Sequence, residues 1–103
     1  MNSLTSKQRA HLRKQAHHLK PVVLVGSDGV NPAVLASVAD ALNTRELLKV
    51  KLQESAPTGV RDAAAAMTDG LLGVHTVQTI GRTIVLYREH PEKPEIRLPR
   101  AGS

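Results

Sequence analysis

Apolar residues at helical spacing predict a helix near the start of the chain. Over residues 6–18, Leu12 and Ala16 share one side of a helix, with polar and basic positions on the other. Thr5 followed three residues later by Gln8 forms the capping-box pattern that is typical of a helix start. The exposed side of this helix is therefore expected to be cationic.

Two further helices are predicted from their ends and their apolar spacing. Asn31 followed by Pro32 is a typical helix start, so a second helix is expected over about residues 32–43. An Ala-rich third helix is expected to begin near Val60 and to stop near Gly73. Both helices carry an apolar stripe and are expected to pack on a sheet.

Two strands are predicted between the helices. The run PVVLV at residues 21–25 is apolar without alternation, which favours a central strand covered on both faces. Residues 46–53 alternate instead, with leucine and valine on one side and Lys49 and Lys51 on the other. This second strand is expected to have one packed face and one open or edge face.

The end of the chain predicts a hairpin and an extended tail. Residues 76–87 read as two strands joined by the Gly-Arg pair at 81–82, which suits a two-residue hairpin turn. The tail 91–103 is Pro-rich and excludes a helix, although Ile96 and Leu98 suggest one short edge strand. The order helix, strand, helix, strand, helix, hairpin predicts a compact single α/β domain.

Positive charge is concentrated in the first quarter of the chain. The 103 residues carry a net charge of +5. Nine of the 14 Lys and Arg residues follow the first acidic residue and balance the nine acidic residues. The five that precede it are Lys7, Arg9, Arg13, Lys14 and Lys20. Such a cluster is typical of proteins that bind polyanions, and the alternative is a solvated, solubilising helix face. With one aromatic residue, Tyr87, the chain has little on which to stack bases, so a nucleic-acid partner would have to be held by its backbone and shape.

The sequence offers no pattern for catalysis, a metal or a cofactor. There is no cysteine, and the histidines of the first helix lack the i, i+4 spacing of two ligands on one helix face. Ser27 lies in G-S-D-G and not in the G-x-S-x-G of a hydrolase. We therefore expect a non-enzyme without a small-molecule substrate. The longest branched apolar run, Val22 to Val25, is far below the ~20 residues of a membrane span, so a soluble, cytoplasmic protein is expected.

The stretch VGSDGVNP places Gly26 and Gly29 on either side of Ser27 and Asp28, between a strand and a helix start. One interpretation is a turn that needs a glycine at positive φ. The other is a loop whose bare backbone N–H groups, beside a helix N-terminus, receive a phosphate. The sequence leaves both interpretations open.

Taken in order, LTSKQRAHLRKQAHHLKPVVLVGSDGV, ELLKVKL and VQTIGRTIVLYR resemble the CRM domain, the RNA-binding module of chloroplast RNA splicing and ribosome maturation, and its stand-alone bacterial YhbY-type members. The resemblance covers residues 4–100, so 1–100 is expected to form the CRM-type domain. It implies a four-stranded mixed sheet with helices packed on it, similar to the C-terminal domain of translation initiation factor three. It also implies a G-x-x-G loop at 26–29. Asp28 departs from the neutral or basic residues common there.

The resemblance implies a role in assembly of the large ribosomal subunit, with structured ribosomal RNA as the partner. The basic first helix and the G-x-x-G loop are the expected contacts, flanked by Lys49, Lys51 and Arg82. A protein-interaction adaptor that binds a ribosomal protein or assembly factor through its sheet is the alternative. Membrane-surface binding by the first helix is the third hypothesis.

Overall fold

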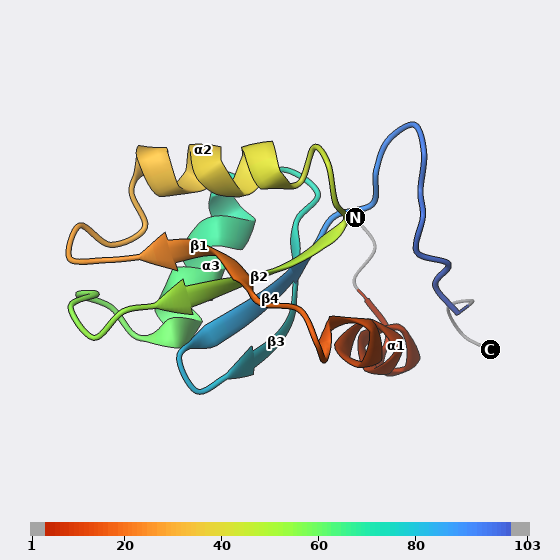
Figure 1. Ribbon diagram of the computed structural model, residues 1–103, viewed down its shortest axis with the longest axis horizontal. Coiled ribbons are helices and arrows are strands. Elements are labelled where there is room, and N and C mark those ends of the chain that lie inside the picture. Colours follow the sequence, from red (N-terminus) through yellow and green to blue (C-terminus); the bar gives the residue numbers. More distant parts are fainter. Residues whose placement is uncertain (1–3, 100–103) are drawn as a thin grey trace.

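The computed structural model describes residues 4–99 (Figure 1). The described residues form three helices and four strands in the order α1 (Ser6–Ala16), β1 (Pro21–Val25), α2 (Pro32–Ala41), β2 (Leu47–Leu52), α3 (Val60–Gly70), β3 (His75–Ile80) and β4 (Thr83–Tyr87). The predicted α/β class and element order are confirmed. Helices α1 and α2 each end two residues earlier than predicted, at Ala16 and Ala41.

The four strands form one mixed sheet in the order β1-β2-β4-β3. Strands β1 and β2 are parallel, and the other two pairings are antiparallel. The prediction of a central first strand was wrong, because β1 is an edge strand whose Val22 and Leu24 are 45% and 55% exposed. Its outward positions are apolar too, which hides the alternation of buried and exposed residues. The alternating strand β2 lies inside the sheet instead.

The predicted helix starts are confirmed by their hydrogen bonds. The Thr5 hydroxyl accepts from Gln8 N at 3.1 Å, and the Gln8 side chain accepts from Thr5 N at 3.0 Å, which completes the capping box of α1. Asn31 caps α2 by accepting from Val34 N at 2.9 Å. The hairpin turns at Gly81, whose φ of 57° suits the first position of a two-residue type II′ turn. Local chemistry thus determines these boundaries.

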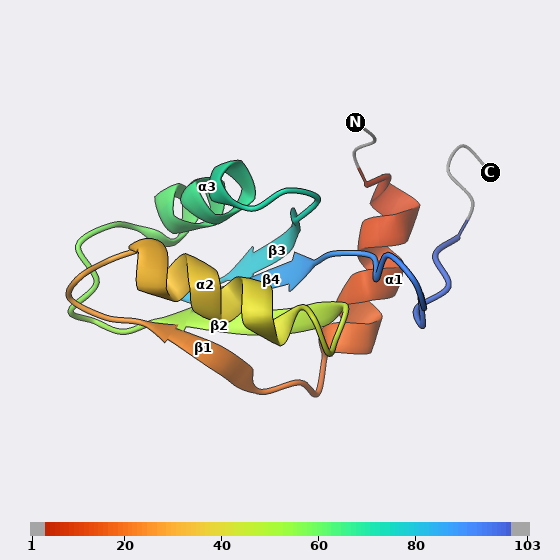
Figure 2. The ribbon, with the colours of Figure 1, turned by 90° about the horizontal axis from the view of Figure 1, so that it is seen from above.

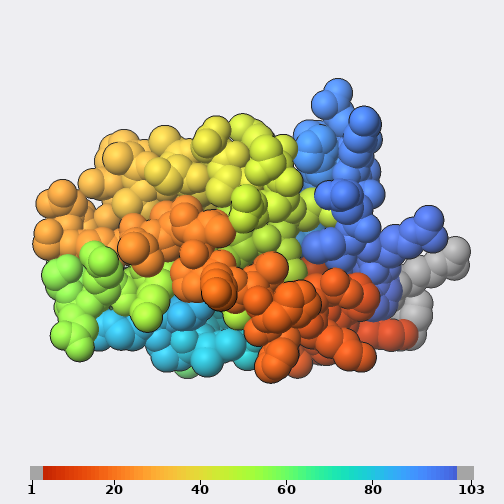
Figure 3. All heavy atoms as spheres, in the orientation of Figure 1, coloured from red at the N-terminus to blue at the C-terminus, as the bar shows by residue number. Residues whose placement is uncertain are grey.

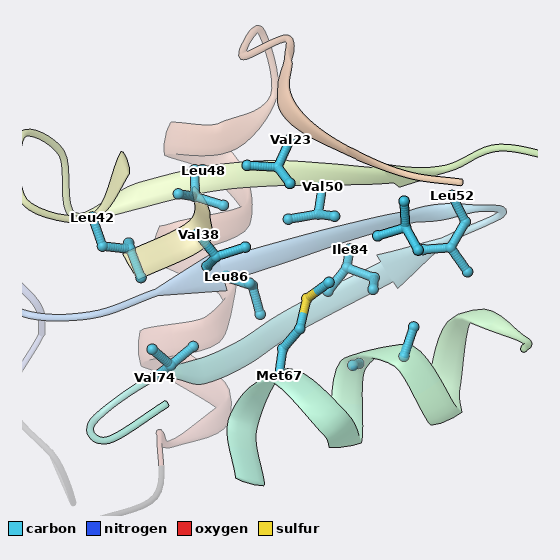
Figure 4. Packing of buried hydrophobic residues seen from close by; sticks show 13 residues of the cluster. Val23, Val38, Leu42, Leu48, Val50, Leu52, Met67, Val74, Ile84 and Leu86 are labelled. Carbon is cyan, nitrogen blue, oxygen red and sulfur yellow. The ribbon is translucent and has the colours of Figure 1, made fainter. Parts of the chain in front are cut away.

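Helices α2 and α3 cover one face of the sheet. Met67 of α3 lies over Ile84 and Leu86 of β4, and Val38 of α2 lies toward the same cluster (Figure 4). All four side chains are completely buried. Full burial of such a side chain stabilises the fold by roughly 1.5–3 kcal/mol. This face is therefore the main core.

Helix α1 packs on the opposite face and covers only part of it (Figure 2). Its Leu12 and Ala16 pack with Val77, Val85 and Tyr87 of the hairpin. The strand ends toward the β3–β4 turn extend beyond α1. The part of this face that α1 leaves uncovered, here called the open half of the sheet, is defined by the outward residues Val22, Leu24, Lys49, Lys51, Gln78, Ile80 and Thr83.

The tail is extended, as predicted, but its described part up to residue 99 forms no strand, so the predicted edge strand at Ile96 and Leu98 was wrong. Both side chains pack against the α1 cluster instead. The buried carboxylate of Glu46 accepts from the backbone N–H groups of Glu95 and Ile96 at 2.8 and 2.7 Å. These hydrogen bonds, and not pairing with a strand, hold the backbone of this part of the tail. Residues 100–103 of the predicted tail, and residues 1–3 of the predicted domain, lie outside the described residues.

Candidate nucleic-acid interface

Acidic residues are unevenly distributed over the elements of the fold. Helix α1 and the four strands contain no Asp or Glu. The nine acidic residues lie in α2, α3, the connecting segments and the tail. The surface formed by α1 and the open half of the sheet, here called the α1 face, therefore has cations from α1 and β2 and no carboxylate from its own elements.

The predicted cations are spread along the α1 face. Lys7, Arg13 and Lys14 are exposed on α1, and Lys20 is exposed just before β1. On β2, Lys51 is exposed and Lys49 is half-buried. In Figure 3, α1 lies at one end of the long axis, and the loop after β1 lies at the other. The lysines of β2 lie between these two ends.

Two predicted contact residues are engaged with the protein backbone. Arg9 is half-buried, and its Nη1 donates to the carbonyl of Thr76 and, at 3.5 Å, to that of Val77. Arg82 donates from Nη2 to the carbonyl of Gln53 at 2.8 Å, and from Nε to that of Leu52 at 3.3 Å. These guanidinium groups tie α1 to β3, and the hairpin turn to β2. Part of their donor capacity is thus used within the fold.

A hollow of about 480 Å³, here called the α1 hollow, lies where the end of α1 meets the open half of the sheet. Its lining brings together predicted contacts from two elements, Arg13 and Lys14 of α1 and Lys49 of β2. Residues absent from the sequence prediction complete it, namely His17, His18, Gln78 and Ile80. His17 and His18 follow directly on the end of α1, whereas only the strand pairing could have revealed Gln78, which lies opposite Val85, which in turn lies opposite Lys49.

The G-x-x-G loop lies beside the loop that follows β2, at the end of the sheet away from α1 (Figure 1). Gly29 N donates to the Gly26 carbonyl at 3.0 Å, which closes the loop as a turn. Gly29 has φ of +69°, and a Cβ there would lie 3.1 Å from Pro57 Cγ. The turn interpretation of Gly29 is therefore supported by its backbone and its packing.

The start of α2 offers few free donors to a phosphate. Pro32 has no N–H, and Val34 N–H is already capped by Asn31. Among the described backbone hydrogen bonds, none has the N–H of Ser27 or Asp28 as its donor. A hollow of about 610 Å³ beside this loop is lined by Asp28 and by no Lys or Arg. Electrostatics therefore favours the α1 face over the loop as the main site for a polyanion.

A buried junction under α1 joins the sheet to the tail. The Glu46 carboxylate is 4% exposed and accepts from the backbone N–H of His90 at 2.7 Å, besides those of Glu95 and Ile96. Burial alone would raise the pKa of Glu46, but these three donors outweigh it and hold the pKa below its usual value. Sequence patterns gave no signal for this residue, because its partners lie 44 to 50 positions away.

Tyr87, the single aromatic residue other than histidine, belongs to the same junction. Its side chain is 3% exposed and stacks on His75, with ring centroids 6.5 Å apart. Burial, together with the charges of Glu46 and Glu89, raises the pKa of Tyr87 to about 12. The ring is part of the core and is not available to stack on a base, as the composition predicted.

Other kinds of site find no support in the described part of the chain. Another hollow, of about 1010 Å³, lies between the start of α1 and the tail, and its lining includes Glu89 and Glu92, which disfavour an anion. Among residues 4–99, no three His, Asp or Glu side chains are grouped to hold a metal ion. No described helix combines the length and apolarity needed to cross a membrane.

An α/β domain with an acid-free, cationic face formed by a helix and a half-open sheet has the features of a nucleic-acid-binding module. The model of the CRS1/YhbY (CRM) domain matches residues 4–88, and the chain belongs to this family. It is 45% identical to the probable RNA-binding protein YqeI of Bacillus subtilis over 93% of this chain and 99% of the relative. It is 41% identical to an RNA-binding protein of Haemophilus influenzae over 97% and 99% of the two chains.

A solved structure has the same fold. The solution structure of SAV1595 from Staphylococcus aureus, described as a candidate RNA-binding protein, matches with a TM-score of 0.79 and 35% identity. The match covers 93% of this chain and 99% of the other. The family and these relatives are RNA-binding proteins and not enzymes.

Proposed function

We propose that the protein binds structured ribosomal RNA during assembly of the large ribosomal subunit, with the α1 face as its main contact surface. The observation that carries this proposal is the segregation of charge: α1 and the four strands contain no acidic residue, and Arg13, Lys14 and Lys49 converge on one hollow. Release of counterions from the RNA backbone drives association with such a surface.

The contacts follow from the exposure of the side chains. Lys7, Arg13, Lys14 and Lys20 dock on phosphate and sugar groups, and Lys49 and Lys51 continue the track across the sheet. Arg9 and Arg82 mainly fix the geometry, because the fold already uses some of their donors. The G-x-x-G loop is a secondary contact through the N–H groups of Ser27 and Asp28.

The ribosomal partner is tested by sedimentation of a cell lysate at low magnesium. We expect the protein to co-sediment with large-subunit particles or their precursors and to be released by added salt, because its contacts are mainly ionic. A variant with Arg13→Gln and Lys14→Gln serves as the control and should stay near the top of the gradient. Salt-resistant co-sedimentation of that variant would favour the adaptor hypothesis, and absence of the wild-type protein from the particles would refute the ribosomal role.

The loop is tested by substitutions that separate its two interpretations. We expect Gly29→Ala to lower the free energy of unfolding by about 1 kcal/mol or more, because φ is positive and Pro57 is close. If the loop contacts phosphate, Ser27→Asp weakens RNA binding and Asp28→Lys strengthens it, with little change in melting temperature. Asp69→Lys on α3 is the matched control for Asp28→Lys. Unchanged affinity in both loop variants would leave the glycine pair as a turn alone.

A further inference from the structure

The α1 hollow combines three chemical features in one small space. Its floor is apolar and buried, formed by Ala16 and Val85, which are 2% and 1% exposed. Its walls carry the cations Arg13, Lys14 and Lys49, and no carboxylate lines it. One neutral amide, Gln78, lies in the sheet wall, where it offers a hydrogen-bond donor and an acceptor.

These features specify the chemistry of a ligand. The cations require an anionic group, and Ile80, which is 52% exposed, favours an apolar surface placed against it. The amide of Gln78 fits a group with both donors and acceptors on its edge. A nucleotide has all three: a phosphate, a base with an apolar face, and a polar base edge. The volume of about 480 Å³ is within the roughly 300–1,000 Å³ of small-ligand sites, which suits one nucleotide and not a duplex.

We infer that the α1 hollow receives one unpaired nucleotide of the bound RNA. Its base packs on Ile80 with its edge toward Gln78, and its phosphate lies among Arg13, Lys14 and Lys49. This inference rests on the proposed function and adds a preference for RNA with an unpaired position.

A paired nucleotide does not suit this hollow. In a duplex the base faces are already stacked, so the surface presented to the protein is mostly phosphate and ribose. A phosphate placed on the apolar floor would lose hydration without a partner. A nucleotide within an RNA chain is favoured over a free one, because cations beyond the hollow, Lys7 on α1 and Lys51 on β2, can bind the neighbouring phosphates.

The test compares two hairpin RNAs with the same paired stem, one of which has a single extra unpaired nucleotide. We expect the wild-type protein to bind the bulged RNA about fivefold or more tightly, since burial of apolar surface on Ile80 and a hydrogen bond to Gln78 together contribute about this factor. Gln78→Ala and Ile80→Ser should abolish this preference, so that each variant binds the two RNAs equally, and should keep the wild-type salt dependence because neither side chain is charged. Leu72→Ser is the control, because Leu72 is 94% exposed and lies outside the hollow.

Thermal melting of each variant checks that it folds. Equal wild-type affinity for the two RNAs, or a preference that persists in both hollow variants, would overturn the inference and leave the proposed function intact. Binding of neither RNA would overturn both. If adenosine or uridine monophosphate alone bound as tightly as the bulged RNA, the assignment to a nucleotide within a strand would be wrong.

Discussion

Replacing Glu46 by alanine is expected to lower the free energy of unfolding by about 2–4 kcal/mol, because three backbone N–H groups lose a charged acceptor. This is a large share of the roughly 5–15 kcal/mol that stabilises a domain of this size. Urea denaturation measures the loss. Hydrogen exchange adds a local readout, since the amides of Glu95 and Ile96 should exchange much faster in the variant.

Two further variants make the Glu46 result specific. Glu95→Ala, in the same tail, removes an exposed carboxylate and keeps the backbone N–H, so little change is expected. Glu46→Gln keeps one oxygen that accepts from Glu95 and Ile96, but it places an NH₂ group, which cannot accept, opposite the N–H of His90. The loss of unfolding free energy is therefore expected to be smaller than in Glu46→Ala. Equal stability of Glu46→Ala and the wild type would refute the role of this carboxylate in holding the tail.

The contribution of Glu46 should also depend on pH. The folded-state pKa of Glu46 lies below its ordinary value of 4.5, so the unfolded chain takes up a proton first as the pH falls. The stabilisation is therefore fully present above pH 4.5 and is lost as the pH falls through the folded-state pKa. The stability difference between wild type and Glu46→Gln should narrow below about pH 4.5. A difference that stays constant down to about pH 2 would contradict this mechanism.

Neutralising Arg13 and Lys14 together is expected to weaken RNA binding about 25- to 60-fold at 0.1 M salt, if each contacts one phosphate. Both side chains are exposed on α1 and line the α1 hollow, so their removal leaves the core unchanged. Fluorescence anisotropy with a labelled hairpin RNA measures the loss. The matched control is Arg61→Gln with Lys93→Gln, which changes the net charge equally at exposed positions on α3 and the tail. Equal losses in the two double variants would mean that net charge alone drives binding.

The parts of the fold that could be predicted depend on nearby residues. The capping box of Thr5 and Gln8, the cap at Asn31 and the turn at Gly81 each act within a few positions, so their chemistry is visible in the sequence. The alternation around Lys49 and Lys51 likewise identified a strand with one packed face. The cationic side of α1 followed from the same helical spacing that identified its buried residues.

The parts that could not be predicted depend on tertiary contacts. The run 21–25 is apolar at every position, so only the strand order shows that Val22 and Leu24 face outward at an edge. Glu46 contacts segments 44 to 50 residues away, and no local pattern marks such a partner. The α1 hollow joins a helix end to three strands, which requires the register of the hairpin and of β2. Arg9 and Arg82 look like free cations in the sequence, although both bind backbone carbonyls.

The salt dependence of RNA affinity tests the central claim most directly. Four to six phosphate contacts on the α1 face predict that log K falls linearly with log salt, with a slope of about −3 to −5.4. Neutralising Arg13 and Lys14 should make this slope shallower by about 1.4–1.8, whereas neutralising Arg61 and Lys93 should leave it unchanged. A wild-type affinity that stays flat between low and high salt would contradict binding of RNA through the cations of the α1 face.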